Sequence, residues 1–193
     1  MGDRLLMRKA LAVLSLLFAS TLMYAAPAPA PSGWKARVAA ELPLLGHRNW
    51  ILIVDSAYPL QVSPGIETIE TNANQIDVVR SVLSTVNRSI HVRPYIFMDA
   101  ELPFVPDQDV PGASAYRQQI GALLRGYHLE TELHDKVIAD IGETGKSFKV
   151  LVLKTNMTIP YSSVFIQLRA KYWSDADEKR LRGKMAAEPH PAH

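Results

Sequence analysis

Cysteine is absent from this sequence of 193 residues, which excludes disulfides, thiolate metal ligands, thiol nucleophiles and a lipoprotein anchor. Net charge is also small, because 21 Lys and Arg stand against 19 Asp and Glu and leave a formal charge of +2. The two signs are interspersed along the chain, so the sequence gives no reason to expect nucleic acid as a partner. Stability must come from packing, and a chain of this length with 48% hydrophobic residues suffices for one core.

A nucleotide-binding phosphate loop is also missing, although one stretch resembles it. The segment IGETGKS at 141–147 ends in Gly-Lys-Ser, but the phosphate-cradling pattern needs a glycine five positions before Gly145, where the sequence has Asp140. The following FKVLVL at 148–153 predicts a strand, not the helix whose N-terminus would face a phosphate. We interpret the segment as a Gly-containing turn or short helix between two strands.

The first residues have the pattern of an export signal. Three basic residues precede the apolar run at 11–26, which has the length of a signal core, is short for a membrane span, and is followed by small residues. We predict a signal peptide over 1–26, cleaved near residues 25–28, and a Pro/Ala linker over 27–33. The alternative is an uncleaved N-terminal anchor. Export predicts a periplasmic or extracellular protein that has no membrane contact once the signal is removed.

Hydrophobic periodicity predicts helices and strands in alternation along the rest of the chain. Helical spacing of apolar residues occurs at 34–46, 74–86 and 114–127. Strand patterns occur at 50–55, 66–71, 92–99, 136–140, 149–155 and 162–168. The alternation predicts a single α/β domain over 34–172 with a largely parallel sheet flanked by helices. A charged tail at 173–193 is expected to form a solvated helix that frays.

Titratable residues stand at both ends of the apolar strand predicted at 50–55. Ligands of open α/β sheets bind outside the carboxyl ends of the strands, so Asp55 stands where a reacting carboxylate is expected. His47 precedes the strand. Because a strand rises about 3.3 Å per residue, His47 and Asp55 are too far apart to touch within one chain, although they could meet across a subunit interface. Alternatively, Asp55 caps the next turn and His47 only follows a helix end. Asp99 and Glu101 also follow a strand, where carboxylates most often cap loops.

Two blocks of this sequence resemble the ribose pyranase and fucose mutarotase family. LGHRNWILIVDSAYP at 45–59 is similar to the family's Leu-Gly-His, polar link, apolar strand and Asp-Ala with a following proline. KTNMTIPYSSVFIQL at 154–168 is similar to its final strands around Pro-Tyr-Ala-Asn. The resemblance spans about residues 35–170 and implies the family's fold. It also implies interconversion of cyclic forms of a free monosaccharide by proton transfer, with no metal and no organic cofactor.

The resemblance implies catalytic roles for three residues. His47 matches the family's catalytic histidine and would carry the proton. Asp55 matches the aspartate that orients this histidine or binds a sugar hydroxyl, and Tyr161 matches the tyrosine whose phenol donates to the ring oxygen or holds a hydroxyl. The family's ring-shaped, commonly decameric assembly places its sites between subunits. A homo-oligomer with shared sites is therefore expected.

Three further positions are expected to bind the substrate, and each departs from the family pattern. The family's Thr-Gly-Glu turn is replaced by residues 155–157, with Asn156 at its centre, and the family's final-block asparagine is Ser163. His134 takes the place of a second family histidine only if the connection has gained several residues, since the aligned position falls near Ala139. Otherwise His134 is a surface histidine.

The sequence therefore predicts a cofactor-independent isomerase that interconverts anomers, or pyranose and furanose forms, of a monosaccharide. The alternative is a non-catalytic, exported monosaccharide-binding or structural relative of the same fold. A third interpretation is an ordinary α/β domain whose match is accidental, which predicts a monomer and no effect on sugars.

Overall fold

The structure is a computed structural model that describes residues 33–187. The predicted signal peptide at 1–26 lies outside the described residues, as does the linker at 27–33 except for Gly33. The described part of the chain contains no helix with the length and hydropathy that a membrane span requires.

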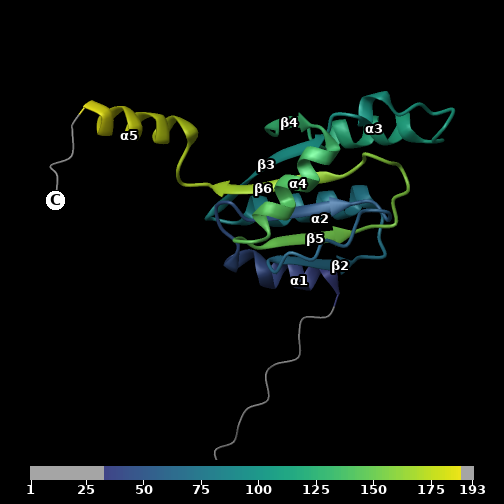
Figure 1. Ribbon diagram of the computed structural model, residues 1–193, viewed down its shortest axis with the longest axis horizontal. Helices are drawn as coiled ribbons and strands as arrows, with labels where there is room; N and C mark the ends of the chain where they lie inside the picture. The colour runs from purple at the N-terminus through teal and green to yellow at the C-terminus, as the bar shows by residue number, and fades with distance from the viewer. Residues whose placement is uncertain (1–32, 188–193) are drawn as a thin grey trace, which may run out of the picture.

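Six strands form one mixed sheet in residues 33–187 (Figure 1). They are β1 (Trp50–Val54), β2 (Ile66–Glu70), β3 (Val92–Asp99), β4 (Leu129–Glu132), β5 (Val150–Lys154) and β6 (Val164–Ala170). Their order across the sheet is β2-β5-β1-β6-β3-β4. The β1·β5, β2·β5 and β3·β4 pairs are parallel, whereas β6 runs antiparallel to both β1 and β3. The prediction of an α/β fold with a largely parallel sheet is confirmed.

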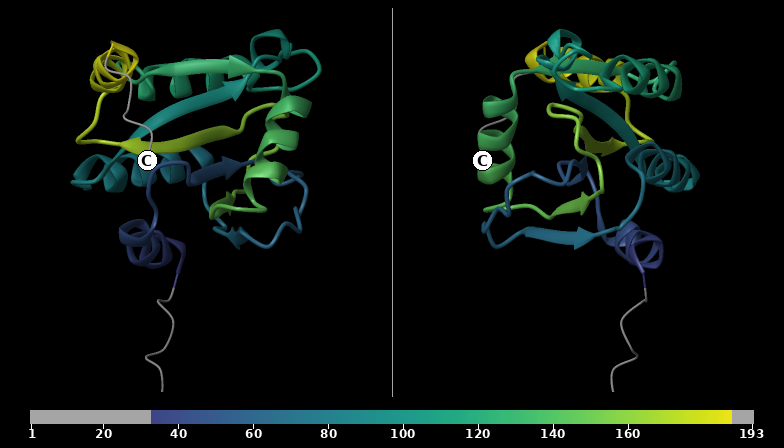
Figure 2. Two further views of the ribbon diagram at one scale, coloured as in Figure 1. Left: turned by 60° about the vertical axis from the view of Figure 1, so that its left-hand side comes forward. Right: turned by 90° about the vertical axis from the view of Figure 1, so that its right-hand side faces the viewer.

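Helices cover both faces of this sheet (Figure 2). They are α1 (Trp34–Glu41), α2 (Gln75–Arg88), α3 (Ala113–Leu123), α4 (His134–Thr144) and α5 (Asp175–Ala187), with short 3₁₀ turns at Leu42–Leu44 and Leu102–Phe104. The buried side chains of α1, α2 and α3 belong to one apolar cluster, and those of α4 belong to a second cluster on the opposite face. The core is therefore two apolar layers separated by the sheet.

The central strand β1 is buried on both faces, as its continuous apolar run predicts. Leu52 and Val54 pack in the α4 cluster, whereas Ile51 and Ile53 pack in the cluster of α1, α2 and α3, because successive side chains of a strand point to opposite faces. The predicted helix cap Asn74 is also confirmed, since its side chain accepts a hydrogen bond of 2.9 Å from the backbone of the second residue of α2.

The strand predicted at 136–140 is wrong, because these residues lie inside α4. Val137 and Ile141 are buried four positions apart, and so present one apolar face to the sheet. A short apolar run has no periodicity that separates a buried strand from a buried helix. The segment 141–147 consequently contains the end of α4 and the turn that leads to β5. It therefore connects a helix to a strand, and not two strands as expected.

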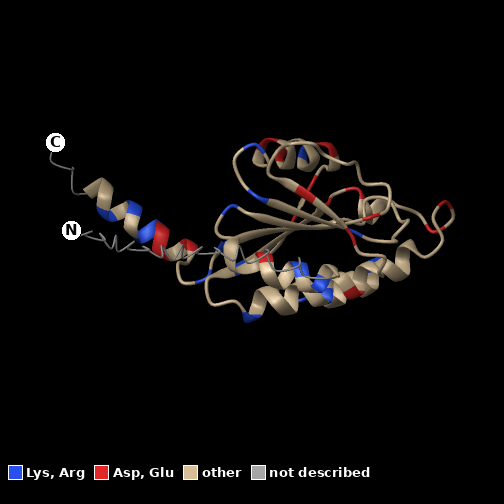
Figure 3. Cartoon of the chain, turned by 90° about the horizontal axis from the view of Figure 1, so that it is seen from below, with Lys and Arg blue, Asp and Glu red and all other residues tan. Residues whose placement is uncertain are grey.

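The two ends of the fold hold elements that differ from the expectation. The edge strand β4 was not predicted, because its sequence LETE is mostly polar and lacks strand alternation. The predicted helices at 34–46 and 114–127 end earlier, at Glu41 and Leu123. The helix α5 lies in the predicted charged tail, buries none of its residues and projects from the domain with acidic residues in its first turn (Figure 3).

Candidate functional site

A cleft of about 450 Å³ opens at the carboxyl ends of the central strands. It is lined by the loop 55–59 after β1, by Thr158, Pro160 and Tyr161 of the loop between β5 and β6, and by His134 at the start of α4. Ligands of open α/β sheets bind at the carboxyl ends of the strands, because loops from several neighbouring strands converge there.

Asp55 is the first residue after β1 and is 8% exposed at the wall of this cleft. Its Oδ1 accepts a hydrogen bond of 2.8 Å from the backbone N–H of Ala57, which forms a local turn. The other carboxylate oxygen has no hydrogen bond to the residues that the structure describes. Asp55 therefore caps the turn and also offers one free acceptor to the cleft.

His134 is the first residue of α4, and its imidazole is 22% exposed. The Nδ1 atom lies 3.0 Å from Oδ1 of Asp99, the last residue of β3. Glu101 holds the backbone of the same residue, because its carboxylate oxygens accept the His134 N–H at 3.0 and 3.2 Å. Glu101 is thus the loop and helix cap expected of a carboxylate after a strand, whereas Asp99 contacts a residue of the cleft.

Asp99 is 1% exposed, and this burial raises the pKa of its carboxyl to about 6. The hydrogen bond and the charge of His134 oppose this rise in pKa, while Glu101 and Asp55 add to it by repulsion. The Oδ2 atom of Asp99 is buried and has no hydrogen-bond partner among the described residues.

Tyr161 faces His134 across the cleft. The two rings meet edge to face, with centroids 5.3 Å apart and planes at 87°. Tyr161 is 37% exposed and has a φ of +57°, a left-handed conformation that is rare for a bulky side chain. Such backbone strain persists only where the surrounding structure holds it, and it is concentrated at functional sites.

A buried polar network holds the loop that carries Tyr161. The Gln75 side chain is fully buried, and its amide N–H groups donate to the Tyr116 hydroxyl at 3.0 Å and to the Ser162 carbonyl at 2.5 Å. Its amide oxygen accepts from the Thr155 hydroxyl at 3.1 Å, and the Tyr116 hydroxyl donates to the same Ser162 carbonyl. Helices α2 and α3 therefore fix both ends of the loop.

Two of the positions expected to bind the substrate do not line this cleft. Asn156 is exposed on the loop, where its backbone N–H donates to the Ala73 carbonyl at 3.2 Å. Ser163 is fully buried, and its hydroxyl has no partner among the described residues. The sugar contacts expected of Asn156 and Ser163 stay predictions.

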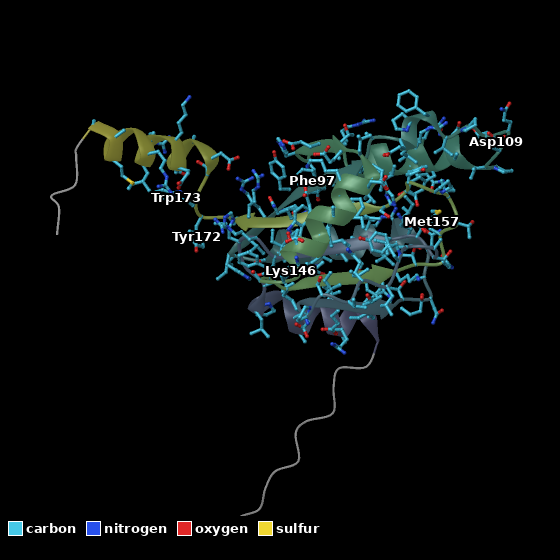
Figure 4. The ribbon with its side chains drawn as sticks, in the orientation of Figure 1. Phe97, Asp109, Lys146, Met157, Tyr172 and Trp173 are labelled. Atoms are coloured by element: carbon cyan, nitrogen blue, oxygen red, sulfur yellow. The ribbon has the colours of Figure 1, made fainter. Side chains whose placement is uncertain are left out.

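His47 and Asp55 lie at opposite ends of the central strand β1. His47 lines a second cleft, of about 540 Å³, with Arg48, Arg93, Arg169 and the residues that lead into α5. Figure 4 labels Tyr172 and Trp173 beside this end, and Met157 of the loop that carries Tyr161 at the other end. The five residues of β1 alone separate the two ends of this strand by about 16 Å. Within one chain, His47 therefore does not meet the cleft of Asp55.

The single chain thus brings together Asp55, His134 and Tyr161, and adds Asp99, which the sequence interpretation left as a loop cap. One feature of the sequence could have indicated Asp99 as a site residue. It stands at the end of a predicted strand, in the same position as Asp55. No group of three or more His, Cys, Asp or Glu side chains in residues 33–187 is arranged to hold a metal ion.

Several solved structures resemble this domain. RbsD from Bacillus subtilis, solved in complex with D-ribose, gives a TM-score of 0.51 at 16% identity and covers 69% of this chain and 92% of RbsD. The fucose mutarotase from Streptococcus pneumoniae, in complex with L-fucose, gives 0.46 at 20% identity over 72% and 95% of the two chains. FucU from Bifidobacterium longum gives 0.47 at 14% identity over 70% and 94%.

No family model and no curated protein sequence matches the chain. The structural likeness to RbsD extends over nearly all of that protein. The chain therefore has the RbsD fold, and its resemblance to the ribose pyranase and fucose mutarotase family is confirmed at the level of the fold.

Proposed function

We propose that the protein interconverts cyclic forms of a free monosaccharide by acid and base catalysis in the cleft of Asp55, His134 and Tyr161. The observation that carries the proposal is the convergence of a carboxylate, an imidazole and a phenol in one open cleft of a fold that also binds D-ribose in RbsD. Groups of these three kinds can accept or donate protons and hydrogen bonds without a cofactor.

Ring opening requires one proton to leave the sugar and another to arrive. His134 Nε2 takes the proton of the anomeric hydroxyl, the bond between the anomeric carbon and the ring oxygen breaks, and the Tyr161 phenol protonates the ring oxygen. The product is the open-chain aldehyde, which closes on its other face or through another hydroxyl. Asp55 accepts a hydrogen bond from a sugar hydroxyl through its free oxygen and so orients the ring.

Exchange spectroscopy tests this proposal directly. Saturation-transfer NMR on ribose, fucose, galactose and glucose should show faster anomer exchange with the wild-type protein and none above background with His134→Ala. His128→Ala is the matched control, because His128 is an exposed histidine that pairs with Glu130 on β4 and does not line the cleft. Equal exchange rates with and without protein, for all four sugars, would contradict an isomerase of these substrates.

The non-catalytic alternative is favoured by one observation, since Asn156 and Ser163, two positions expected to bind the sugar, do not line the cleft. Saturation of protein signals that transfers to a sugar, together with unchanged anomer exchange, would support a binding protein. The absence of any sugar signal would contradict both functions.

We also propose a homo-oligomer in which His47 of one subunit reaches the cleft of another and takes part in the proton transfer there, as the resemblance implies. The support is the resemblance, which implies shared sites, together with the separation of His47 from Asp55 within a chain. Mixed oligomers of the His47→Ala and His134→Ala variants should regain part of the activity that each lacks alone, and light scattering should report a mass above 21.4 kDa. A monomer, or mixtures no more active than either variant, would contradict shared sites.

Export of the mature protein is the last part of the proposal, and it rests on the basic start and the apolar run at 11–26. Fractionation of the native host should recover the protein in the periplasm or the medium, with a mature N-terminus near residues 25–28. An intact Met1 in the cell lysate would contradict it.

A further inference from the structure

Asp99 contacts the His134 imidazole from the side that faces away from the cleft. The carboxylate is almost completely buried at the end of β3, and its Oδ1 lies 3.0 Å from His134 Nδ1. His134 itself lines the cleft, whereas Asp99 does not. A sugar in the cleft would therefore touch the imidazole and not the carboxylate.

His134 is the sole hydrogen-bond partner of the Asp99 side chain among the described residues. Burial, and after it the nearby Asp99 charge, raise the pKa of the Tyr58 and Tyr116 phenols. Both phenols nevertheless donate elsewhere, Tyr58 to Gln61 at 2.9 Å and Tyr116 to the Ser162 carbonyl at 2.5 Å. The Oδ2 atom of Asp99 is left without a partner. Burial of a carboxylate with one unpaired oxygen is unfavourable, so packing alone does not account for an aspartate here.

The orientation of the imidazole ring is fixed by its surroundings. Glu101 accepts the backbone N–H of His134. The imidazole ring meets the Tyr161 ring edge to face, with the two centroids 5.3 Å apart. With Nδ1 directed at Asp99, the other nitrogen points to the far side of the ring. Nε2 has no hydrogen bond to the described residues and is not enclosed. It is therefore available to a ligand in the cleft.

We propose that Asp99 is a positioning residue that holds His134 in the tautomer with the proton on Nδ1, so that Nε2 presents its lone pair to the sugar. The proposal deepens the proposed function and rests on it for the sugar step. When Nε2 takes the anomeric proton, the imidazole becomes a cation. The Asp99 carboxylate, 3.0 Å away in a buried environment, stabilises that cation.

The other charged and titratable groups around this pair do not replace Asp99. Glu101 binds the backbone of His134 and not its ring, and Asp55 uses one oxygen in its own turn. Tyr161 meets the ring through an edge-to-face contact. Asp99 is thus the one carboxylate of the described residues within hydrogen-bonding distance of the imidazole.

The tautomer of His134 can be measured without any sugar. In the full mature protein with ¹⁵N-labelled histidine, two-bond ¹H–¹⁵N correlations distinguish the two neutral tautomers, and the missing signals of His134→Ala assign this residue. In the neutral imidazole of His134 we expect a protonated Nδ1 and an unprotonated Nε2. In Asp99→Asn, the amide can donate to Nδ1, which moves the proton to Nε2.

Kinetics provide the second readout. Asp99→Asn should lower the exchange rate at saturating sugar at least about 10-fold with little change in the sugar concentration for half-maximal rate, and should shift the pH profile of the remaining activity. The matched control is Asp77→Asn, which changes an exposed aspartate paired with Arg80 and should alter neither readout. A thermal unfolding scan of each variant ensures that folded proteins are compared.

Different results would overturn different statements. A wild-type His134 that carries its proton on Nε2, or an Asp99→Asn variant with the wild-type tautomer and pH profile, would overturn the role of Asp99 even if sugars are interconverted. The Nδ1 tautomer in the wild type and its loss in Asp99→Asn would support that role. If the tautomer is as expected but no sugar exchanges, the proposed function fails and the positioning of His134 by Asp99 remains.

Discussion

Tyr161 meets His134 edge to face, with the ring centroids 5.3 Å apart and the ring planes at 87°. The contact joins the loop after β5 to the first residue of α4, two segments on opposite sides of the cleft. It depends on the left-handed backbone of Tyr161, with a φ of +57°, and on the network around Gln75 that holds the same loop. Each of these features gives a prediction.

The backbone of Tyr161 should be strained. A left-handed conformation costs a residue with a Cβ about 1 kcal/mol or more, whereas glycine adopts it without that cost. We expect Tyr161→Gly to be more stable than Tyr161→Ala by about 1 kcal/mol, although glycine is normally the less stable choice. Urea unfolding of the two variants measures the difference. A Gly variant less stable than the Ala variant would contradict the strain.

The hydroxyl of Tyr161 should matter for exchange and not for folding. Tyr161→Phe keeps the ring against His134 and removes only the hydroxyl that we propose protonates the ring oxygen. We expect a loss of anomer exchange of at least about 10-fold, the lower end of what a positioned acid contributes, with an unchanged unfolding midpoint. Tyr127→Phe is the control, because Tyr127 lines neither cleft and its hydroxyl makes an exposed hydrogen bond with Asn87. Equal activity of Tyr161→Phe and wild type would remove the phenol from the mechanism.

Loss of the Gln75 side chain should destabilise the protein strongly. Gln75→Leu leaves the Ser162 carbonyl with one partner fewer and the Thr155 hydroxyl without its amide acceptor, all in a buried environment. We expect a cost of about 2–4 kcal/mol in urea unfolding, as for other broken buried networks. The comparison is Asn87→Ala, which removes an exposed side-chain hydrogen bond to Tyr127 and should cost less than about 0.5 kcal/mol.

Asp99 should make stability fall as pH rises. Its pKa in the folded protein is raised from 3.8 to about 6, so the folded state binds the proton more tightly than the unfolded state does. Below about pH 4 the carboxyl is protonated in both states, so its contribution to stability is fully present and does not change with pH. Between about pH 4 and 6 the folded state progressively loses its advantage, by up to about 3 kcal/mol for a shift of this size.

The measurement is the difference between wild type and Asp99→Asn in urea unfolding from pH 4 to pH 7. The amide cannot ionise, so the variant lacks this contribution, and the titrating groups that do not contact Asp99 cancel in the difference. We expect the wild type to lose stability relative to Asp99→Asn as the pH increases. A constant difference across this range would show that Asp99 has an ordinary pKa.

Removal of α5 should leave the domain intact. The helix buries no side chain, and its Asp175 pairs with Arg93 and Arg169 through a carboxylate that is 72% exposed. Exposed ion pairs of this kind contribute about 0–1 kcal/mol. A chain that ends at Ser174 should therefore unfold within about 1 kcal/mol of the chain that includes α5. Val38→Ala in the buried face of α1 is the contrast, with an expected cost of about 1–3 kcal/mol.

Hydrophobic patterning was sufficient to predict most of the fold. The run at 50–55 predicted a strand buried on both faces, and β1 is that strand, because five consecutive apolar residues can be buried only where both faces of the sheet are covered. The stripe at 74–86 predicted α2, and Asn74 predicted its start. The polar edge strand β4 and the run at 136–140 escaped the same method, since one lacks alternation and the other is too short to show a period.

By itself, the sequence determined the α/β class, the position of Asp55 at the carboxyl end of β1, and the separation of His47 from it, because these depend only on local patterns and on the length of a strand. Tertiary structure alone decided that His134 lies in the cleft with Tyr161 and that Asp99 lies behind it. Those contacts join residues far apart in the chain, through the parallel pairing of β3 with β4 and the start of α4 beside it. Local periodicity carries no information on which strand ends become neighbours.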